Sequence, residues 1–420
     1  MVILVVGLNH RTAPLKVREG VAFDEEQLGS ALLRLTSHVK QGVILSTCNR
    51  TEIYALVGHP KSGAQNIMRF LSDCRGIASQ ELPPYLYQYA QQEAVHHLFQ
   101  VAAGLDSMVL GEDQILGQVR DAFESAKKAK TVGPAFDNLF RRAIRVGKRA
   151  RHETQISRNG VSVSSIAVEF AKKTLGPQGE HKVLVIGAGE MGELTAQAVV
   201  KDWGLRPTIT SRTYERAVKL ARKVKGEAVP FDAMVEALAE ADVVISSTES
   251  PSYLFGPEEV AKALTMRQKP NLCFIDISVP RDIDPAVGRL ENVTLYDIDS
   301  LRREAELGVR GKEEEVARVE AMVEEGVRDF MGWWDTLEVV PTVRALRDKI
   351  EAIRAGELEK ALRQLNGLSD KEKQRIEALT SSIVNKILHQ PVTRLKRPED
   401  GRDYVRVLRE LFDLQEEHTI

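Results

Sequence analysis

The pattern of apolar and polar positions divides the chain into three stretches of different character. The first stretch alternates short apolar runs, typical of buried strands, with apolar residues at helical spacing. Its predicted elements are a strand at 2–6 ended by Gly7, a helix near 24–39, strands at 43–45 and 53–57, and a helix near 63–74. This order predicts a small ferredoxin-like α+β unit, followed by helices to about residue 152.

The second stretch has the pattern of a doubly wound parallel sheet. The apolar strand His181–Ile186 runs into Gly187-Ala-Gly-Glu-Met-Gly192, and a helix is predicted from Glu193 to Val200. A GxGxxG motif between a strand and a helix predicts a Rossmann unit that binds a dinucleotide. Further strands are predicted at 207–210, 241–245, 272–275 and 295–299.

The third stretch begins near Ser300 and is helical. Apolar stripes recur every three or four residues, first through Val316, Val319, Val323, Val327, Phe330 and Trp334, later through Leu358, Leu362, Leu365, Ile383 and Ile387. We expect Pro341 to interrupt or kink the first helix. Because such an arm cannot bury its stripes alone, we expect it to pair with a second copy of the chain, the alternative being a self-contained helical domain. The predicted domains are therefore 1–155, 160–299 and 300–420.

Composition narrows the functional classes. The 420 residues are 43% hydrophobic with a net charge of -2, so a nucleic-acid partner requires a local basic patch rather than a basic protein. The three cysteines, Cys48, Cys74 and Cys273, lie far apart, which indicates a reducing compartment and no zinc knuckle. Since no apolar run approaches the ~18 residues of a membrane helix, we expect a cytoplasmic protein.

One predicted strand end carries a candidate nucleophile. The apolar run 43–45 stops at Ser46-Thr-Cys-Asn-Arg50, which suggests that the strand delivers the Cys48 thiol to a pocket. We expect the Arg50 cation to lower the thiol pKa and favour the thiolate. Thr47, Asn49 and Arg50 add groups suited to a polar or carboxylate substrate. The alternative is that Cys48 is a small buried hydrophobe.

Two helical segments near this strand bear polar candidates. His96 and His97 are adjacent, so on a helix only one of them can face a given pocket. Gly111-Glu-Asp-Gln114 fits either a site or a helix N-terminus, where acids are favoured. Residues 140–151 are the densest basic stretch, suited to phosphates or simply solvated.

The second stretch also indicates the cofactor. Its second predicted strand ends in Ser211-Arg-Thr213, where NAD enzymes usually carry an acid for the ribose 2′-hydroxyl. A hydroxyl and an arginine suit a 2′-phosphate, so we predict NADP(H), unless Arg212 merely forms a surface ion pair in a degenerate Rossmann fold. Ser247 and Thr248 end another strand and are plausible cofactor neighbours, whereas Cys273 is predicted to be inert core.

Taken together, these stretches resemble the glutamyl-tRNA reductase family over nearly the whole chain. The motifs that carry the resemblance are Gly7-Leu-Asn-His-Arg-Thr-Ala-Pro14, Leu45-Ser-Thr-Cys-Asn-Arg-Thr-Glu52, Gly104-Leu-Asp-Ser-Met-Val-Leu-Gly-Glu-Asp-Gln-Ile-Leu-Gly-Gln118, Gly187-Ala-Gly-Glu-Met-Gly192 and Asp276-Ile-Ser-Val-Pro-Arg-Asp282. The resemblance implies an N-terminal catalytic domain, a Rossmann NADPH-binding domain, and a long spinal helix with a C-terminal helical dimerisation domain, in V-shaped homodimers.

The resemblance also implies a reaction and its residues. The Cys48 thiolate attacks the glutamyl-tRNA(Glu) ester, tRNA leaves, and NADPH reduces the thioester to glutamate-1-semialdehyde, the first step of the C5 route to tetrapyrroles. His97 matches the family's important histidine, to orient groups or to transfer a proton. The glutamyl group is held by Thr47, Asn49, Arg50, Ser107, Glu112, Asp113, Gln114 and Gln118, with Asp113 acting more through its backbone. The cofactor lies on Gly187, Ala188, Gly189, Glu190, Met191, Gly192, Ser211, Arg212, Ser247 and Thr248.

The implied partners are glutamyl-tRNA, a second copy of the chain, and, in a transient complex, glutamate-1-semialdehyde aminotransferase. No metal and no membrane are required. Two other functions stay open: an NADP-dependent thiol aldehyde dehydrogenase that acts on a free small molecule, and a non-catalytic tRNA-binding scaffold with a relic Rossmann unit. Cys48 beside an intact GxGxxG argues against the scaffold, and the basic stretch favours tRNA over a free metabolite.

Overall fold

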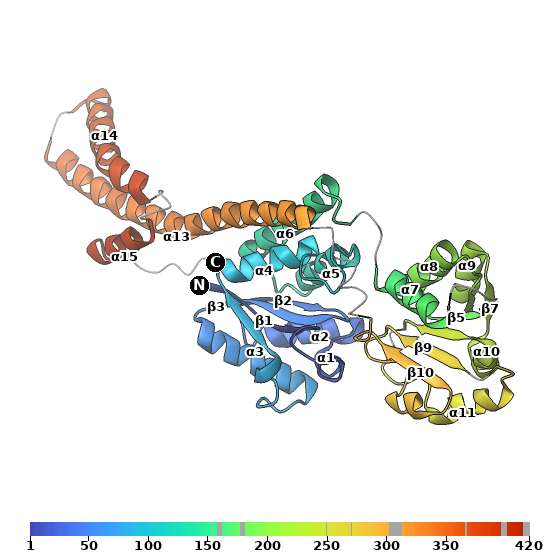
Figure 1. The fold of residues 1–420 in the computed structure, drawn as a ribbon. Helices are drawn as coiled ribbons and strands as arrows, with labels where there is room; N and C mark the ends of the chain where they lie inside the picture. Colours follow the sequence, from blue (N-terminus) through green and yellow to red (C-terminus); the bar gives the residue numbers. More distant parts are fainter. Residues whose placement is uncertain are drawn as a thin grey trace. The chain divides into compact units, whose positions relative to one another are not determined.

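The computed structural model describes residues 1–157, 162–176, 181–248, 250–269, 271–301, 313–365, 368–395 and 401–414. The chain forms two compact units, Met1–Glu324 and Glu325–Ile420 (Figure 1). Within the described ranges, none of the helices combines the length and the apolar character needed to cross a membrane.

The first part of unit 1 is built on a four-stranded antiparallel sheet in the order β2-β3-β1-β4. Its strands are β1 Val2–Asn9, β2 Gln41–Ser46, β3 Arg50–Val57 and β4 Tyr87–Ala90. Its helices are α1 Leu15–Val21, α2 Glu25–Leu35, α3 Pro60–Arg75, α4 Gln92–Ala103, α5 Gln114–Lys128 and α6 Pro134–Glu153, with a short turn η1 Pro83–Tyr85. The ferredoxin-like prediction is confirmed, although α1 and β4 were not predicted.

Helices cover both faces of this sheet. Figure 1 shows α2 and α3 on one side, and α4, α5 and α6 on the other. Helices α4 and α6 approach closely at Gly147, where a Cβ atom would lie 2.4 Å from the Ala102 carbonyl oxygen. The strand ends that carry polar groups are thereby enclosed between the sheet and the second helical layer.

The second part of unit 1 is a six-stranded parallel sheet in the order β10-β9-β8-β5-β6-β7. Its strands are β5 Val183–Ile186, β6 Thr208–Thr210, β7 Glu227–Val229, β8 Val243–Ser246, β9 Leu272–Asp276 and β10 Val293–Asp297. Its helices and turns are α7 Val163–Leu175, α8 Glu190–Ala198, η2 Val199–Trp203, α9 Tyr214–Val224, η3 Phe231–Ala233, α10 Met234–Glu240, α11 Pro257–Met266 and η4 Pro285–Arg289. This is the predicted doubly wound order, and the switch point between β5 and β8 is where such sheets bind ligands.

The C-terminal part consists of α13 Glu313–Gln364, α14 Asp370–Leu395 and α15 Gly401–Leu411. Helix α13 continues through Pro341, so Pro341 does not interrupt the helix, and the kink that was the other expected effect stays a prediction. In unit 2, Leu346, Leu388 and Val392 form a small core.

The first apolar stripe corrects a second expectation. Val319 and Val323, which belong to unit 1, are fully buried in the single chain. These side chains therefore need no partner copy to leave solvent. The apolar side chains that stay exposed lie further along, at Ile353, Leu365, Leu379, Ile383 and Ile387.

Candidate active site

Cys48 lies in the three-residue connection between β2 and β3. The connection is tight because the Thr47 N–H donates to the Arg50 carbonyl oxygen (2.8 Å), and Thr47 Oγ1 accepts from the N–H groups of Asn49 and Arg50 (both 3.2 Å). The buried Arg18 side chain fixes it further, since Nη1 donates to the Cys48 carbonyl oxygen (2.8 Å). The strand end thus delivers the thiol in a defined orientation.

The thiol itself is not activated as expected. Burial, with a further contribution from the Glu112 carboxylate, raises the pKa of Cys48 to about 12, although Arg18 and Arg50 oppose the shift. Arg50 does act to lower this pKa, as expected, but the expected net shift toward the thiolate is wrong. Desolvation disfavours the thiolate more than the two cations favour it.

Arg50 is itself held by a buried acid, Glu52. Glu52 is fully buried, and its carboxylate contacts Arg50 Nη1 (2.6 Å), Tyr54 OH (2.6 Å), Tyr87 OH (2.5 Å) and His97 Nε2 (2.9 Å). Burial opposes the charge of Glu52, but Arg50 and His97 hold its pKa well below the usual range. Burial likewise opposes the charge of Arg50, while Glu52 and its neighbours hold the pKa of Arg50 above its usual value. Arg50 therefore stays charged in this ion pair, and its effect on the thiol pKa is smaller than the effects of burial and of Glu112.

Asp106 completes this network. Its Oδ2 accepts from Arg50 Nη1 (3.0 Å) and from Asn9 Nδ2 (3.3 Å), and its Oδ1 pairs with Arg11 Nη1 (3.0 Å). Arg50 Nη2 donates to the Asp106 carbonyl oxygen. Both terminal nitrogens of Arg50 therefore already bind acceptors, and the side chain organises the site.

The two histidines diverge as predicted. His97 is buried against the rings of Tyr87 and Tyr89, with centroids at 5.3 and 5.0 Å, and contacts Glu52. His96 lies at the surface and pairs with Glu324 through Nε2 (3.1 Å). Only His97 belongs to the site, and within residues 1–157 its ring makes no hydrogen bond to the Cys48 thiol.

A loop from Gly104 to Asp113 carries Ser107, Glu112 and Asp113, three of the remaining candidates. Gly104 and Gly111 have φ values of 79° and 75°, and a Cβ on Gly111 would lie 2.3 Å from the Ile156 carbonyl oxygen. Arg151 anchors the loop, because Nη2 donates to the Glu112 carbonyl oxygen (2.8 Å) and Nη1 to that of Ala102 (3.1 Å). Only glycine tolerates the left-handed backbone at these crowded positions.

This loop orients the predicted substrate residues differently. Glu112 is buried, and burial raises its pKa to about 7. The Asp113 side chain is exposed and pairs with Arg151 (3.3 Å). Gln114 and Gln118 are partly buried and lie one turn apart on α5.

Four buried polar atoms near Cys48 lack a hydrogen-bond partner among the described residues: His10 Nδ1, Arg18 Nε, Asn49 Oδ1 and Ser107 Oγ. Burial and the cations Arg50 and Arg11 lower the pKa of His10 to about 3, so its imidazole is neutral. Buried polar groups are normally paired, so this set fits a polar ligand. His10, Arg18 and Asp106 were missed by the sequence prediction, although His10 and Asp106 lie inside quoted motifs.

Glu52, His97 and Asp106 offer ligand atoms within 4.8 Å of one another, close enough to hold a metal. Arg50 Nη1, however, contacts both carboxylates at 2.6 and 3.0 Å. The guanidinium supplies the positive charge that these acids need.

The glycine motif shows three distinct roles at the switch point. Gly187 has a φ of 109°, and Gly192 lies so close to β5 that a Cβ atom would sit 2.1 Å from the Gly187 carbonyl oxygen. Gly189 caps α8, and its missing Cβ faces open space. This leaves the helix N-terminus, followed by Glu190 and Met191, accessible to a phosphate, so the residues fit a dinucleotide.

The other predicted cofactor residues also lie at strand ends. Ser211 and the exposed Arg212 follow β6, and Ser247 and Thr248 follow β8. The buried Asp282 positions this second strand end, because its carboxylate accepts from Ser246 Oγ (2.5 Å) and the Thr248 N–H (3.0 Å). Cys273 is buried in β9, as predicted.

Comparison with known proteins covers the chain in three segments. The family model described as glutamyl-tRNAGlu reductase, N-terminal domain, matches residues 6–154, and its dimerisation domain matches 318–414. A model described as shikimate / quinate 5-dehydrogenase matches residues 169–304, which indicates a nicotinamide cofactor of the NADP type.

Whole-chain relatives agree with these segments. The chain is 42% identical to glutamyl-tRNA reductase of Geotalea uraniireducens over 99% of this chain and 97% of that protein. It is also 42% identical to the Bacillus subtilis enzyme of that name, over 99% and 92%. A solved structure of glutamyl-tRNA reductase from Methanopyrus kandleri matches with a TM-score of 0.52 at 35% identity, covering 98% of this chain and 99% of that one.

Proposed function

The chain belongs to the glutamyl-tRNA reductase family, and on this premise we propose that it reduces glutamyl-tRNA(Glu) to glutamate-1-semialdehyde with NADPH and releases tRNA. This is the first step of C5 tetrapyrrole synthesis. One observation carries the proposal: Cys48 packs against the same hydrophobic cluster as Ala188 and Met191 of the glycine motif. A thiol and a dinucleotide turn in one packed unit suit acyl transfer followed by reduction.

In the first step, Cys48 Sγ bonds to the glutamyl carbonyl carbon and the bond to the tRNA 3′ oxygen breaks. The thiol must lose a proton, and the ribose oxygen must gain one. We assign the thiol proton to Glu112, which acts electrostatically on Cys48, titrates near neutral pH and can pass the proton on to the leaving ribose oxygen. The glutamyl group is then bound as a thioester to Cys48, whose turn is held by Arg18 and Thr47.

The reduced nicotinamide supplies the hydride for the second step. On our proposal its dinucleotide is held by the glycine motif, Ser211 and Arg212, with Ser247 and Thr248 at the neighbouring strand end. Collapse of the resulting hemithioacetal forms the aldehyde and breaks the C–S bond, and the freed Cys48 thiolate takes up the proton that the hemithioacetal hydroxyl loses.

The glutamyl group is proposed to occupy the space lined by the unpartnered polar atoms of His10, Arg18, Asn49 and Ser107. Thr47, Gln114 and Gln118 complete its surroundings, and Asp113 contributes only its backbone, since its side chain pairs with Arg151 at the surface. His97 holds Glu52 and thereby Arg50, which favours an orienting role over proton transfer from the thiol.

For the tRNA, we propose the exposed side of α6, which presents Arg141, Arg145, Lys148 and His152. Its apolar side is buried through Phe140, Ala143 and Val146. Cations on one solvent-facing side suit a phosphate backbone. The transient complex with the aminotransferase stays a prediction.

Cofactor preference is tested at Arg212. The side chain is exposed and has no ion pair within residues 181–248, so it is available for a 2′-phosphate. Arg212→Ala should weaken NADPH binding by about 1.5–3 kcal/mol and leave NADH binding nearly unchanged. Titration of both cofactors measures this, with the exposed Arg222→Ala on α9 as control. Equal losses of affinity for both cofactors would show that Arg212 does not bind the 2′-phosphate.

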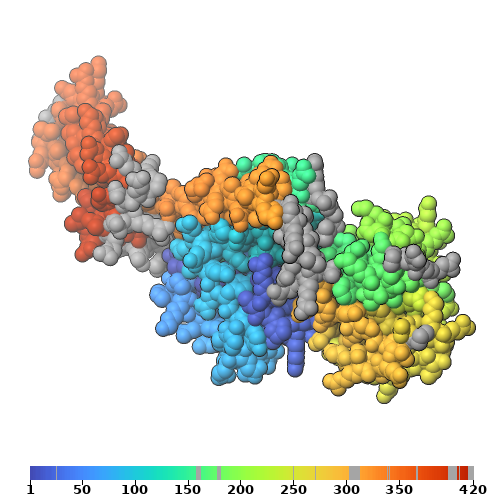
Figure 2. All heavy atoms as spheres, in the orientation of Figure 1, coloured from blue at the N-terminus to red at the C-terminus, as the bar shows by residue number. Residues whose placement is uncertain are grey.

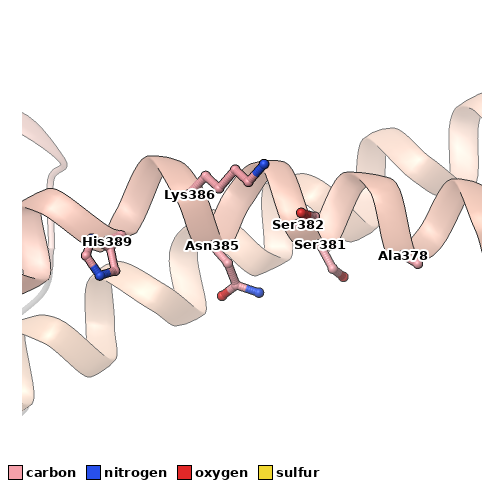
Figure 3. A pocket seen from close by; sticks show the side chains of 6 residues that line it. All are labelled: Ala378, Ser381, Ser382, Asn385, Lys386 and His389. Atoms are coloured by element: carbon pink, nitrogen blue, oxygen red, sulfur yellow. The ribbon is translucent and has the colours of Figure 1, made fainter.

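A homodimer through unit 2 is proposed from the exposed side chains of α14. Ile383 and Ile387 are 49% and 62% exposed and lie one turn apart. A hollow of about 490 Å³ on another side of α14 is lined by small and polar residues, including Ser381, Asn385 and His389 (Figure 3). The exposed apolar face marked by Ile383 and Ile387 is the one that suits a helix from a second copy.

The double variant Ile383→Asp, Ile387→Asp should therefore be monomeric, because two carboxylates cannot be buried in an apolar interface. Light scattering measures the mass, and Leu33→Asp, at a residue 60% exposed on α2, is the matched control. A double variant that stays dimeric at micromolar concentration places the interface elsewhere.

The assay that tests the function incubates the protein with glutamyl-tRNA and NADPH and detects semialdehyde. Deacylated tRNA should compete. Reduction of a free small-molecule thioester, unaffected by deacylated tRNA, would favour the aldehyde-dehydrogenase alternative. Binding of tRNA without NADPH oxidation would favour the scaffold.

A further inference from the structure

Helix α1 is short, yet two adjacent residues on it make ion pairs with the nucleotide-binding part of unit 1. Glu19 binds Arg281, in the turn after β9, and Arg18 binds Asp299, just after β10. In one pair α1 supplies the acid, Glu19, and in the other it supplies the base, Arg18. Figure 2 shows the N-terminal residues, in dark blue, lying against the orange residues near 300.

The Glu19–Arg281 pair has the geometry of a strong contact. Glu19 Oε1 accepts from the Arg281 backbone N–H (2.8 Å) and from Nε (2.9 Å), and Oε2 accepts from Nη2 (2.8 Å). Both side chains are mostly shielded, with exposures of 15% and 17%. A bidentate fork supported by a backbone donor fixes orientation as well as distance.

Arg18 connects this junction to the nucleophile. Its side chain is 2% exposed. Nη1 donates to the Cys48 carbonyl oxygen (2.8 Å), while Nη2 binds Asp299. One guanidinium therefore touches both the thiol-bearing turn and the end of the parallel sheet.

We propose that α1 is a latch that holds the nucleotide-binding sheet against the Cys48 turn during hydride transfer, with Glu19 and Arg281 as positioning residues. The inference rests on the proposed function. Arg18 and Glu19 can pair with Asp299 and Arg281 in only one position of α1 against the sheet. If α1 shifted so that the partners exchanged, like charges would meet.

The hydrophobic packing around α1 joins the Cys48 side of unit 1 to the parallel sheet, and the hydride must pass across this junction. One hydrophobic cluster contains Leu15 of α1, Met108 and Val109 of the loop from Gly104 to Asp113, Val185 of β5 and Ile275 of β9. Thioester formation uses groups of residues 1–157 alone. Hydride transfer also needs the reacting atoms within ~3–3.5 Å, across the junction that the latch closes.

The test compares Glu19→Arg, Arg281→Glu and the double charge swap in the full-length protein. Thioester formation is followed in single turnover by tRNA release without NADPH, and reduction by NADPH oxidation. Each single variant should form the thioester at the wild-type rate and lose reduction on the order of 10²-fold, the effect of a misplacement of about 1 Å. NADPH affinity should not change, and the double swap should recover most of the reduction rate.

Two controls carry the same charge change without a partner across the junction. Glu26→Arg and Arg289→Glu lie on exposed positions of α2 and η4, and both should behave as wild type. If a charge reversal does not fold, Glu19→Gln and Arg281→Gln give the same comparison with a smaller loss. Three outcomes would overturn the latch. The single variants could reduce the thioester at the normal rate, they could lose thioester formation as much as reduction, or the charge swap could fail to restore reduction. A wild-type protein that forms no semialdehyde overturns the proposed function instead.

Discussion

Replacing Cys48 with serine is expected to leave a folded, NADPH-binding protein that forms no glutamate-1-semialdehyde. The substitution changes one atom in a turn held by backbone contacts and by Arg18, so the site should keep its shape. A serine oxygen is much harder to ionise than sulfur, and this site already raises the pKa of the thiol to about 12. An oxygen ester is also a poorer hydride acceptor than a thioester.

The loss should be at least about 10³-fold in turnover, as for other enzymes that lose a covalent nucleophile. Semialdehyde formation and single-turnover tRNA release measure it, because both require the acyl transfer. Cys74→Ser is the matched control, since Cys74 is a partly exposed thiol on α3. Near-native turnover of the Cys48 variant would exclude a covalent mechanism.

Local patterns predicted the elements because each pattern has a local cause. Apolar runs at 43–45 and 53–57 lie in fully buried strands of the central sheet. The GxGxxG turn required left-handed backbone at Gly187 and close packing at Gly192, and both are present. Among the elements that were missed, three are short: α1 has seven residues, β4 has four and β7 has three. Such segments carry too few apolar positions to show a period.

Electrostatics could not be read from neighbouring residues. The sequence places Arg50 two residues from Cys48, but it does not show that Asp106, 56 residues away, binds the guanidinium. Nor does it show that the Glu112 carboxylate acts on the pKa of the thiol. A thiol pKa depends on the sum of burial and charge at one point in space, which only the folded chain defines.

The prediction that the first apolar stripe needs a second copy to cover it was wrong for a related reason. Spacing correctly identified Val319 to Trp334 as one buried helix face. Spacing does not identify the surface that covers the face, and for Val319 and Val323 unit 1 itself is sufficient. The exposed residues Ile383 and Ile387 now mark the proposed interface.

Glu52 should be the most important single residue for the stability of the N-terminal sheet. Glu52→Gln keeps the size of the side chain but removes the charge that Arg50, at 1% exposure, requires. Breaking a buried ion pair by removing one partner typically costs about 3–5 kcal/mol. Asp106 still binds Arg50, which places the expected loss toward the lower end. Tyr54→Phe, which removes one neutral donor to the same carboxylate, should cost less, about 1–3 kcal/mol.

The loss should also depend on pH in a defined direction. The pKa of Glu52 is lowered in the folded protein, so its stabilising contribution is complete above the ordinary value of 4.5 and declines as the pH falls below it. The difference between wild type and Glu52→Gln should therefore be constant from about pH 5 upward and shrink in acid. Because the chain has several domains, hydrogen exchange of the paired amides of β1 and β3 is the proper measurement. Equal protection in both proteins at neutral pH would show that the Arg50–Glu52 pair contributes no net stability, and that its role is confined to shaping the site.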